Sequence, residues 1–341
     1  MKVVVVGTGL IGGSIGLAAR ERLGATVVGV DPDPAPALAV GAIDEAATLE
    51  TALDGADAAF VAVPVADLAE AVAATLALAP AGCVVSDVGS VKRALVDAID
   101  DERFVGGHPL AGGEASGAAH ARADLFEGAT WYLTPSKATA GLRLQQLHSL
   151  LGGLGARPAI VDAATHDRVM AAISHLPHVI ANVIVEGASE ALGGDLGGHG
   201  GAGPSFRDAT RVAGANPQLW AQIYAANSEA LLDRIDATMA RLGEIRGRLA
   251  DGEDLAGWQA EAGRLVVAAR REDAELRMVV PNRPGVVAEI ALALAGEGIN
   301  IGDMSLSPSP DMASGALSIW VAADRAERAS ELLAEHGLTV A

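Results

Sequence analysis

The sequence has little that could cross-link it, bind a polyanion or span a membrane. Cys83 is the only cysteine in 341 residues, so no intrachain disulfide can form and a reducing cytoplasm is the expected location. Lysine occurs only at Lys2, Lys92 and Lys137, and the formal net charge is −19. A chain this acidic lacks the basic patch that nucleic acid or an anionic membrane requires. No uninterrupted apolar run approaches the ~20 residues of a membrane span, so a soluble protein is expected.

The first half of the chain alternates two patterns. Short Val-rich runs predict strands, and Ala- and Leu-rich segments of helical length separate them. Several runs are apolar at every position, which is typical of strands buried on both faces. Residues 1–161 are therefore predicted to form a largely parallel, doubly wound α/β sheet. The predicted strands are "KVVVV", "ATVVGV", "ADAAFVAV", "GCVVSD", "RFVGG", "TWYLT" and "ARPAIV".

Two further regions follow. Long helical patterns at 162–192, 217–249 and 253–272 predict an all-α domain over residues 162–272, and such long helices are expected to pack on a second subunit. Residues 273–341 return to a mixed pattern that predicts the order βαββαβ, a small antiparallel sheet covered by helices.

A glycine motif follows the first predicted strand. Gly7, Gly9 and Gly12 have the spacing G-x-G-x-x-G, directly before a helical pattern. In dinucleotide-binding folds the first glycine permits a tight turn, the second lets the backbone approach a pyrophosphate, and the third lets the helix pack on the strand. Leu10 and Ile11 lie between the last two glycines, where the first helical amides could receive the phosphates.

The choice between NAD and NADP depends on the end of the second strand. Asp31 lies there, 19 residues after Gly12. A carboxylate at this point accepts hydrogen bonds from the ribose hydroxyls and repels a 2′-phosphate. No Lys or Arg occurs between Arg22 and Lys92 to hold that phosphate, so the sequence predicts NAD. A glycine-rich turn with a solvated aspartate is the alternative.

Two motifs follow later strands, where α/β sheets bind ligands. "SDVGSVK" carries Ser90 and Lys92, which could reach cofactor or substrate, although Ser90 could instead cap the next helix. "GGHPLAGGEASG" carries His108 in front of a proline, with Glu114 six residues later. Histidine has an ordinary pKa of about 6.5 and can take a proton at neutral pH. His108 is therefore a candidate general base.

The helical region holds three more candidates. His175 and His178 are three residues apart on one predicted helical face, and Pro177 between them is expected to kink the helix and turn the rings toward a cleft. At least one ring would then face substrate, and ordinary helix packing is the alternative. No acidic or cysteine cluster completes a metal site, so no metal is expected. Arg211 could bind a substrate carboxylate as a planar fork, or pair with Asp208.

Five motifs together resemble the prephenate and arogenate dehydrogenase family. They are "GTGLIGGS", "DVGSVK", "GGHPLAGGEASG", "SHLPH" and "FRDATRVAGANPQLW", in that order, and the likeness covers about residues 1–270. The remaining segment, with "VPNRPGVVAEIALALAGEGINI", resembles an ACT domain, a module that senses amino acids. The resemblance implies a Rossmann-type domain, a helical dimerisation domain and an ACT-like domain in a homodimer.

The same resemblance implies roles for individual residues. His108 would accept the proton of the ring C4 hydroxyl while hydride leaves that carbon for NAD, and Ser90 would assist by a hydrogen bond near that hydroxyl. Lys92 would lie at the cofactor. The substrate would be bound by Arg211, Glu114, His178 and Trp220, the last from its own or the partner subunit. His175 is a further substrate-binding candidate from its helical spacing alone. An effector such as tyrosine would bind near Asn282, Arg283, Gly285, Val286 and Asn300, unless this tail only dimerises.

Other functions stay open at this stage. Prephenate is the expected substrate, with arogenate, or both, as the alternative. A β-hydroxyacid dehydrogenase of the 6-phosphogluconate type would need a lysine in the helical domain, and no lysine follows Lys137. A catalytically silent amino-acid sensor is a further alternative, motivated by the ACT-like tail.

Overall fold

The computed structural model describes residues 1–341 except for 113–114, 196–202, 270–272, 282–285, 287–288, 291–292, 295–296, 298, 300, 310–312 and 341. The described chain divides into two compact units, Met1–Arg241 and Leu242–Ala341.

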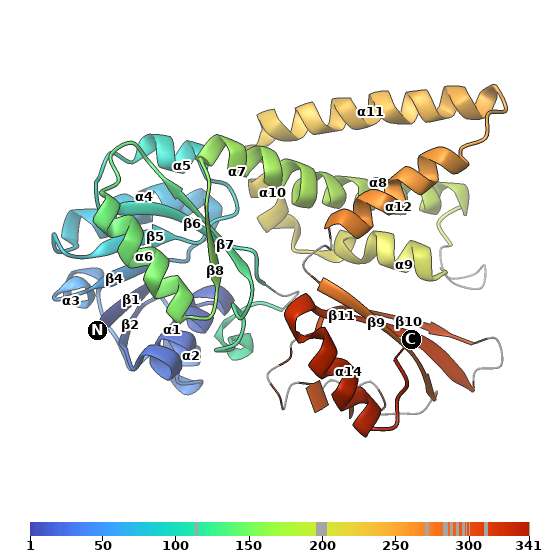
Figure 1. Ribbon diagram of the computed structural model, residues 1–341. Coiled ribbons are helices and arrows are strands. Elements are labelled where there is room, and N and C mark those ends of the chain that lie inside the picture. Colours follow the sequence, from blue (N-terminus) through green and yellow to red (C-terminus); the bar gives the residue numbers. More distant parts are fainter. Residues whose placement is uncertain are drawn as a thin grey trace. The chain divides into compact units, whose positions relative to one another are not determined.

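The first unit is built on an eight-stranded sheet with the strand order β3-β2-β1-β4-β5-β6-β7-β8 (Figure 1). Neighbouring strands run parallel except for the antiparallel pair β6 and β7. All seven predicted strands are confirmed, and a short edge strand, β3, is added. The strands are β1 (Lys2–Val6), β2 (Thr26–Val30), β3 (Glu45–Ala46), β4 (Ala58–Val61), β5 (Val84–Asp87), β6 (Phe104–Pro109), β7 (Thr130–Pro135) and β8 (Arg157–Ile160).

Helices cover both faces of this sheet, as the doubly wound prediction requires. In β1, Val3 and Val5 belong to one hydrophobic core and Val4 and Val6 to the other, because successive side chains point to opposite faces. Burying each valine stabilises the fold by about 1.5 kcal/mol or more, so a run that is apolar throughout requires both helix layers. The first core contains residues of α1 (Leu10–Leu23), α2 (Ala35–Ala39) and α6 (Gly141–Gly153), and the second contains residues of α3 (Leu49–Leu53), α4 (Leu68–Leu78) and α5 (Arg93–Ala98).

Cys83 lies in the second core. Its side chain is completely buried, and burial is the main cause that raises the pKa of the thiol to about 11. The thiolate is the reactive form of cysteine. The residue is therefore an unreactive part of the core at neutral pH.

The rest of the first unit is helical. Its elements are α7 (Ala163–Met170), a π-helical segment (Ala171–His175), α8 (Leu176–Ala191), α9 (Pro204–Thr210), a 3₁₀ turn (Arg211–Gly214), α10 (Pro217–Ala226) and α11 (Ser228–Ala250), whose last turns belong to the second unit. Asn216 caps α10, since its Oδ1 accepts hydrogen bonds from the amides of Gln218 and Leu219 at 3.0 and 3.2 Å. The single helix expected over 217–249 is thus two helices, α10 and α11, with Asn227 between them.

The expected irregularity near Pro177 is a π-helical segment. Pro177 lies in the first turn of α8 and has no amide hydrogen to donate to the carbonyl of Ile173. The five residues Ala171–His175 directly before α8 take the wider π-helical turn. Segments of this kind occur inside α-helices, often at functional sites. Of the two histidines expected to turn toward a cleft, His178 lines the described pocket and His175 is buried.

The second unit contains α12 (Ala256–Ala269), a three-stranded antiparallel sheet in the order β10-β11-β9, and α14 (Ala326–Glu335). The strands are β9 (Asp273–Pro281), β10 (Ile301–Pro308) and β11 (Ser314–Ala322). Alternate residues of β9 and β11 pack with α14 in a separate core that includes Met278, Ile319 and Leu333. The expected last strand is a single bridge between Val340 and Met278. Most of the helix expected over 284–297 lies outside the described residues. The small α+β architecture expected for this region is confirmed.

Candidate active site

The glycine turn between β1 and α1 has the geometry that a pyrophosphate needs. Gly7 has φ +88°, and a Cβ added to it would lie 2.5 Å from the carbonyl oxygen of Ala62. A Cβ on Gly12 would lie 1.9 Å from the carbonyl oxygen of Gly7, so α1 packs directly on the turn. A Cβ on Gly9 would meet nothing within 4 Å, which leaves the backbone there open to a ligand. Gly9 is the N-cap of α1 and supplies no side-chain cap, so the first helical amides, from Leu10 and Ile11 on, can receive an anion.

Asp31 follows β2 beside this turn. Its Oδ2 accepts a hydrogen bond from the amide of Thr8 at 2.7 Å, and its Oδ1 accepts one from the amide of Asp33 at 2.9 Å. The two bonds hold the carboxylate next to the glycine turn, where the adenosine ribose lies in dinucleotide-binding folds. Together with the turn, this carboxylate fits NAD.

Lys92 lies in a different environment from the one expected. Its side chain is completely buried, and its Nζ forms an ion pair with the equally buried Asp87. Nζ also donates a hydrogen bond to the carbonyl oxygen of Gly107 at 2.8 Å. Burial is the main cause that lowers the pKa of Lys92, and Asp87 opposes the shift. A lysine held in this way does not extend to a cofactor; it ties the loop after β5 to β6.

Asp87 completes that connection. Its Oδ2 accepts a hydrogen bond from the amide of Gly89 at 2.8 Å and its Oδ1 one from the amide of Gly107 at 3.1 Å. Both oxygens therefore order the backbone at the carboxyl ends of β5 and β6. Ser90 lies in the loop between Gly89 and Lys92, and it is half-buried. It does not cap the next helix, because α5 begins at Arg93 with Lys92 as its N-cap residue.

His108 lies near the end of β6 and is 9 % exposed. Burial is the first cause that holds the pKa of its imidazole well below the ordinary value, and the neighbours His166, Lys92 and His175 add to the shift. The ring is therefore neutral at pH 7, as a general base must be before it accepts a proton. Its Nδ1 lies 2.9 Å from Nε2 of His166.

His166 and Asp167 were not among the predicted site residues. His166 is fully buried in α7, and its Nδ1 lies 2.8 Å from Oδ1 of Asp167. Asp167 also accepts hydrogen bonds from the amides of Lys92 and Arg93, at 2.8 and 2.9 Å, and so caps α5 from another helix. The available sequence signal was the adjacent histidine and aspartate in "ATHDRV" at the start of the helical region.

His175 is buried behind the site. It is 1 % exposed, and burial is the main cause that lowers the pKa of its ring to about 4. Its Nδ1 lies 3.1 Å from Nδ2 of Asn227, which also donates a hydrogen bond to the carbonyl oxygen of Asp167 at 2.8 Å. Its ring meets Trp220 edge-on, with centroids 6.1 Å apart. Sequence reasoning missed Asn227, which links His175 to Asp167.

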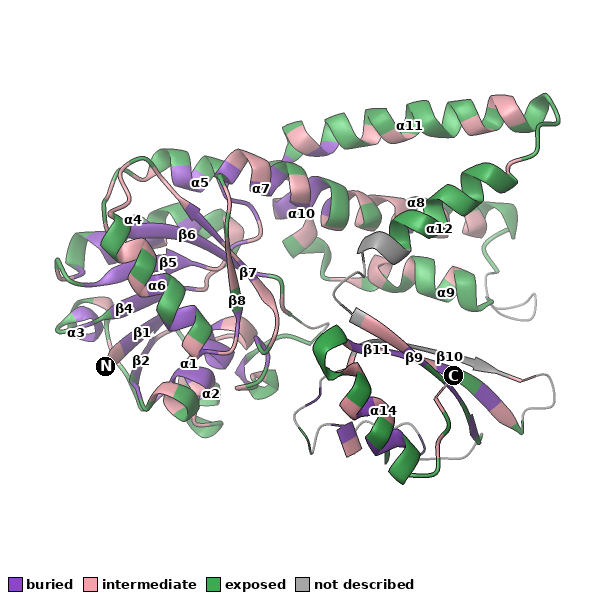
Figure 2. Ribbon diagram, viewed as in Figure 1, coloured by how far each residue is buried: buried purple, intermediate pink, exposed green. Residues whose placement is uncertain are grey.

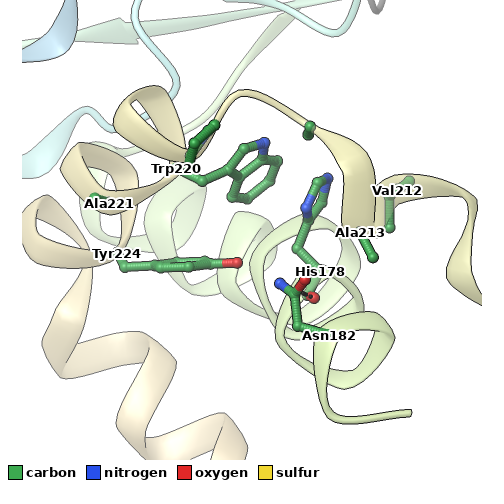
Figure 3. A pocket seen from close by; sticks show the side chains of 9 residues that line it. His178, Asn182, Val212, Ala213, Trp220, Ala221 and Tyr224 are labelled. Atoms are coloured by element: carbon green, nitrogen blue, oxygen red, sulfur yellow. Dashed lines mark hydrogen bonds between the residues drawn. The ribbon is translucent and has the colours of Figure 1, made fainter. Parts of the chain in front are cut away.

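His178 has the open position that His175 lacks. Its ring stacks on Trp220 of the same chain, with centroids 3.3 Å apart and planes 23° apart, and both rings face a pocket (Figure 3). The pocket has a volume of about 200 Å³ and is lined by His178, Asn182, Val212, Ala213, Ala215, Pro217, Trp220, Ala221 and Tyr224. Burial and then the positive charge of Arg211 lower the pKa of His178, which places that guanidinium near the pocket.

The described contacts connect the two parts of the site. His108 contacts His166, His166 contacts Asp167, and Asn227 joins the backbone of Asp167 to His175, whose ring meets Trp220. Glu114 lies outside the described residues. Among the described residues, no group of three or more His, Cys, Asp or Glu side chains could hold a metal ion.

Three family models match successive parts of the chain. The nucleotide-binding domain of prephenate dehydrogenase matches residues 15–160, and the dimerization domain of prephenate dehydrogenase matches residues 162–259. An ACT domain matches residues 274–337.

Individual relatives agree with these matches. Prephenate dehydrogenase of Bacillus subtilis is 33% identical over 98% of this chain and 96% of its own length. The crystal structure of Aquifex aeolicus prephenate dehydrogenase in complex with hydroxyphenyl propionate and NAD⁺ has a TM-score of 0.71 and 28% identity, and covers 79% of this chain and 98% of that one. Synechocystis arogenate dehydrogenase has a TM-score of 0.66 and 29% identity, and covers 80% of this chain and 99% of that one.

Proposed function

Because the chain belongs to the prephenate dehydrogenase family and is an NAD-dependent dehydrogenase, we propose that it oxidatively decarboxylates prephenate to 4-hydroxyphenylpyruvate for tyrosine synthesis. Residues 1–161, 162–272 and 273–341 would carry the cofactor, the substrate and the effector, respectively. The observation that most supports the reaction is the neutral, buried His108 at the end of β6, in the same sheet as the glycine turn. A neutral imidazole at this edge has a free lone pair that can accept the proton of a ring hydroxyl.

The cofactor would be held by the chain's own backbone. The amides at Gly9, Leu10 and Ile11 would receive the pyrophosphate, and Asp31 would accept hydrogen bonds from the ribose hydroxyls. NAD, when bound, accepts the hydride from C4 of the substrate ring. The ion pair of Lys92 and Asp87 would not touch the substrate. It would hold in place the loop after β5, which carries Ser90, and the strand β6, which carries His108.

His108 would move a proton in both directions. It takes the proton of the C4 hydroxyl as hydride leaves C4, so that C4 becomes a ring carbonyl. The bond between the ring and its carboxylate then breaks, CO₂ leaves, and the electron pair of that bond flows into the conjugated carbonyl and makes the ring aromatic. The phenolate oxygen takes the proton back from His108, so there is no net uptake of protons. Ser90 would support His108 by a hydrogen bond at the same oxygen.

The substrate's carboxylates need a positive partner. Arg211 would bind one of them as a planar fork, near the pocket formed by His178 and Trp220. Orientation by such contacts can supply a large share of catalysis, since a correctly held reactant avoids most of the entropic cost of the reaction. Glu114 is proposed at the same site, and His175 would support the pocket from behind through Trp220.

The pocket favours prephenate over arogenate, which carries an amino group in place of the side-chain keto group. None of the nine described residues that line it is acidic, so only Glu114, which lies outside the described residues, is proposed as a carboxylate that could pair with an ammonium group. A neutral His178 and the amide of Asn182 suit a keto acid. Arogenate, alone or together with prephenate, is the second candidate, because Synechocystis arogenate dehydrogenase is among the similar structures.

Initial rates of NADH formation test this proposal. We expect kcat/KM for prephenate to exceed kcat/KM for arogenate by about tenfold or more, equivalent to about 1.4 kcal/mol between the two transition states. A higher value for arogenate would overturn the choice of substrate, and no NADH from either compound would overturn the reaction.

A homodimer is proposed through the helical region. The continuous helical stretch Ala163–Ala191 is long and apolar enough to cross a membrane by length and composition alone, and only 22% of its most apolar window is buried. Figure 2 shows α11 exposed along most of its length, and Leu232 and Met239 on it are 59% and 64% exposed. Because a dimerization-domain model matches these helices, we propose that a second copy of the chain packs on their exposed apolar residues. The proposed location is the cytoplasm.

Feedback inhibition by tyrosine is proposed for the ACT domain. Asn282, Arg283, Gly285 and Asn300 lie outside the described residues. Val286 was also expected at the ligand, but its side chain is buried in the core of the second unit, so we assign it a packing role. In the full-length protein, replacing Asn282 and Asn300 with alanine should raise the tyrosine concentration needed for inhibition. Unchanged inhibition in that variant would place tyrosine at the active site as a product analogue.

A further inference from the structure

We propose that His166 and Asp167 are positioning residues that fix the tautomer of His108, with the proton on Nδ1 and Nε2 free to act as the base. The contact geometry carries this inference. Nδ1 of His108 lies 2.9 Å from Nε2 of His166, and Nδ1 of His166 lies 2.8 Å from Oδ1 of Asp167. The catalytic importance of this arrangement depends on the proposed function, whereas the tautomer itself does not.

Asp167 determines which group donates and which accepts in the hydrogen bonds that run through His166 to His108. Asp167 already accepts hydrogen bonds from the amides of Lys92 and Arg93, so its oxygens act as acceptors. The contact with His166 therefore requires a proton on Nδ1 of that ring. In the proposed arrangement this is the only ring proton of His166, so its Nε2 has a lone pair that accepts a hydrogen bond from Nδ1 of His108. With its own proton on Nδ1, neutral His108 has its lone pair on Nε2, the nitrogen left to face substrate.

Asp167 is held rigidly enough to impose this order. Its two oxygens bind consecutive amides at the start of α5, and its carbonyl oxygen accepts a hydrogen bond from Asn227 at 2.8 Å. The amides at the start of α5 thus fix the carboxylate, and Asn227 at the junction of α10 and α11 fixes the backbone of the same residue. An orienting group held by several elements keeps a catalytic histidine in one tautomer and one direction.

The arrangement also compensates charge when His108 takes up a proton. The groups around it are Lys92 from the loop after β5, His166 from α7 and His175 from the π-helical segment. Asp167 lies behind His166, Tyr132 of β7 packs on the His166 ring, and Asp87 pairs with Lys92. An imidazolium at His108 keeps its Nδ1 proton directed at His166, and the Asp167 carboxylate stabilises it through that ring. Removing His166 would leave the imidazolium beside Lys92 without this support.

The tautomer can be measured without any assay of activity. Full-length protein labelled with ¹⁵N in the histidine rings gives distinct nitrogen shifts for protonated and unprotonated ring nitrogens at pH 8, and the spectrum of His108→Asn identifies the signals of His108. We expect the proton of His108 on Nδ1, the less common tautomer of histidine in water. A proton on Nε2 in the wild-type protein would overturn the proposal, whatever the substrate is.

Kinetics then test the consequence. His166→Phe keeps a ring but removes both hydrogen bonds, His166→Gln keeps an acceptor oxygen, and His148→Phe alters an exposed histidine as a control. We expect kcat of His166→Phe to fall at least about 10-fold and at most about 10⁴-fold, the loss found when a catalytic histidine takes the wrong tautomer. The KM for NAD should stay within about twofold, and His166→Gln should recover part of kcat.

The dependence of kcat on pH distinguishes a positioning role of His166 from a general loss of structure in the variant. Without the acceptor the His108 imidazolium is less stable, so the acid limb of kcat for His166→Phe should move to lower pH. A loss of kcat by the same factor at every pH, with an unmoved acid limb, would overturn the positioning role. If the wild-type tautomer is as expected but prephenate and arogenate both remain unoxidised, the inference stands and the proposed function fails.

Discussion

Lys92 and Asp87 form an ion pair from which solvent is completely excluded, with both side chains 0% exposed. Each partner has further bonds: Lys92 donates to the carbonyl oxygen of Gly107, and Asp87 accepts from the amides of Gly89 and Gly107. The pair therefore joins the loop after β5 to the strand that carries His108. Its expected contribution is to stability and to the position of the base.

Replacing Lys92 with methionine should strongly destabilise the protein. The change leaves the Asp87 carboxylate buried without its cation, and breaking a buried pair in this way costs about 3–5 kcal/mol. Denaturant unfolding of the wild type, Lys92→Met and the exposed control Lys137→Met measures the difference. A loss below about 1 kcal/mol would mean that the pair contributes no more than a surface ion pair.

Replacing His108 with asparagine should remove the base and leave cofactor binding intact. We expect kcat to fall by roughly 10² to 10⁴, the usual effect of losing a general base, with the dissociation constant for NAD unchanged. Steady-state rates and NAD titration give the two quantities, and His336→Asn, at an exposed position in the second unit, is the matched control. Equal losses in both quantities would point to a structural role for His108.

Asp31 should decide between NAD and NADP. In Asp31→Ser the hydrogen bonds to the ribose weaken and the repulsion of a 2′-phosphate disappears. Hydrogen bonds to a charged group contribute about 1.5–3 kcal/mol, so kcat/KM for NAD should fall by about 10-fold or more and the ratio of NADP to NAD activity should rise. Glu70→Ser removes an exposed carboxylate from α4 as a control. An unchanged cofactor ratio in Asp31→Ser would exclude this residue from cofactor choice.

Stability should fall as the pH is lowered below the ordinary histidine range. Burial lowers the pKa of His175 to about 4 and that of His108 well below its ordinary value. The unfolded chain binds these protons near pH 6.5 and the folded chain only at lower pH. The two neutral histidines therefore contribute fully to the free energy of unfolding above pH 6.5. Between pH 6.5 and about 4, each histidine can lower the free energy of unfolding by at most about 1.4 kcal/mol for each pH unit.

The variant His175→Gln should have a smaller pH dependence of its free energy of unfolding over this range. Denaturant melts at several pH values, run beside the wild type and the exposed His148→Gln control, measure it. If the slope matches that of the wild type, His175 does not titrate as its burial requires.

Arg211 should act on substrate affinity more than on turnover. In Arg211→Ala the proposed carboxylate loses a charge-assisted partner that contributes about 1.5–3 kcal/mol, so KM for prephenate should rise by roughly 10- to 100-fold while kcat changes less. Arg325→Ala in the second unit is the control, since Arg325 is exposed there. A fall in kcat with KM unaltered would assign Arg211 to the chemical step.

Local patterns were sufficient for much of the architecture. The Val-rich runs predicted all seven long strands of the sheet, because a strand buried on both faces must be apolar at every position. The G-x-G-x-x-G spacing predicted the turn at Gly7, where a positive φ and a close approach to Ala62 exclude larger residues. These features depend on residues close together in the chain, so the sequence by itself determined them.

The contacts within the site depended on the tertiary structure. Lys92 appeared free to reach a cofactor, but the sheet places Asp87 and Gly107 around its ammonium group. His166 meets His108 across 58 residues, and Asn227 meets Asp167 across 60. No periodicity or short motif predicts these long-range contacts, because they depend on where α7 and the junction of α10 and α11 pack against the sheet edge. The sequence determined the folds and the candidate base, and the packing of distant elements decided which groups surround that base.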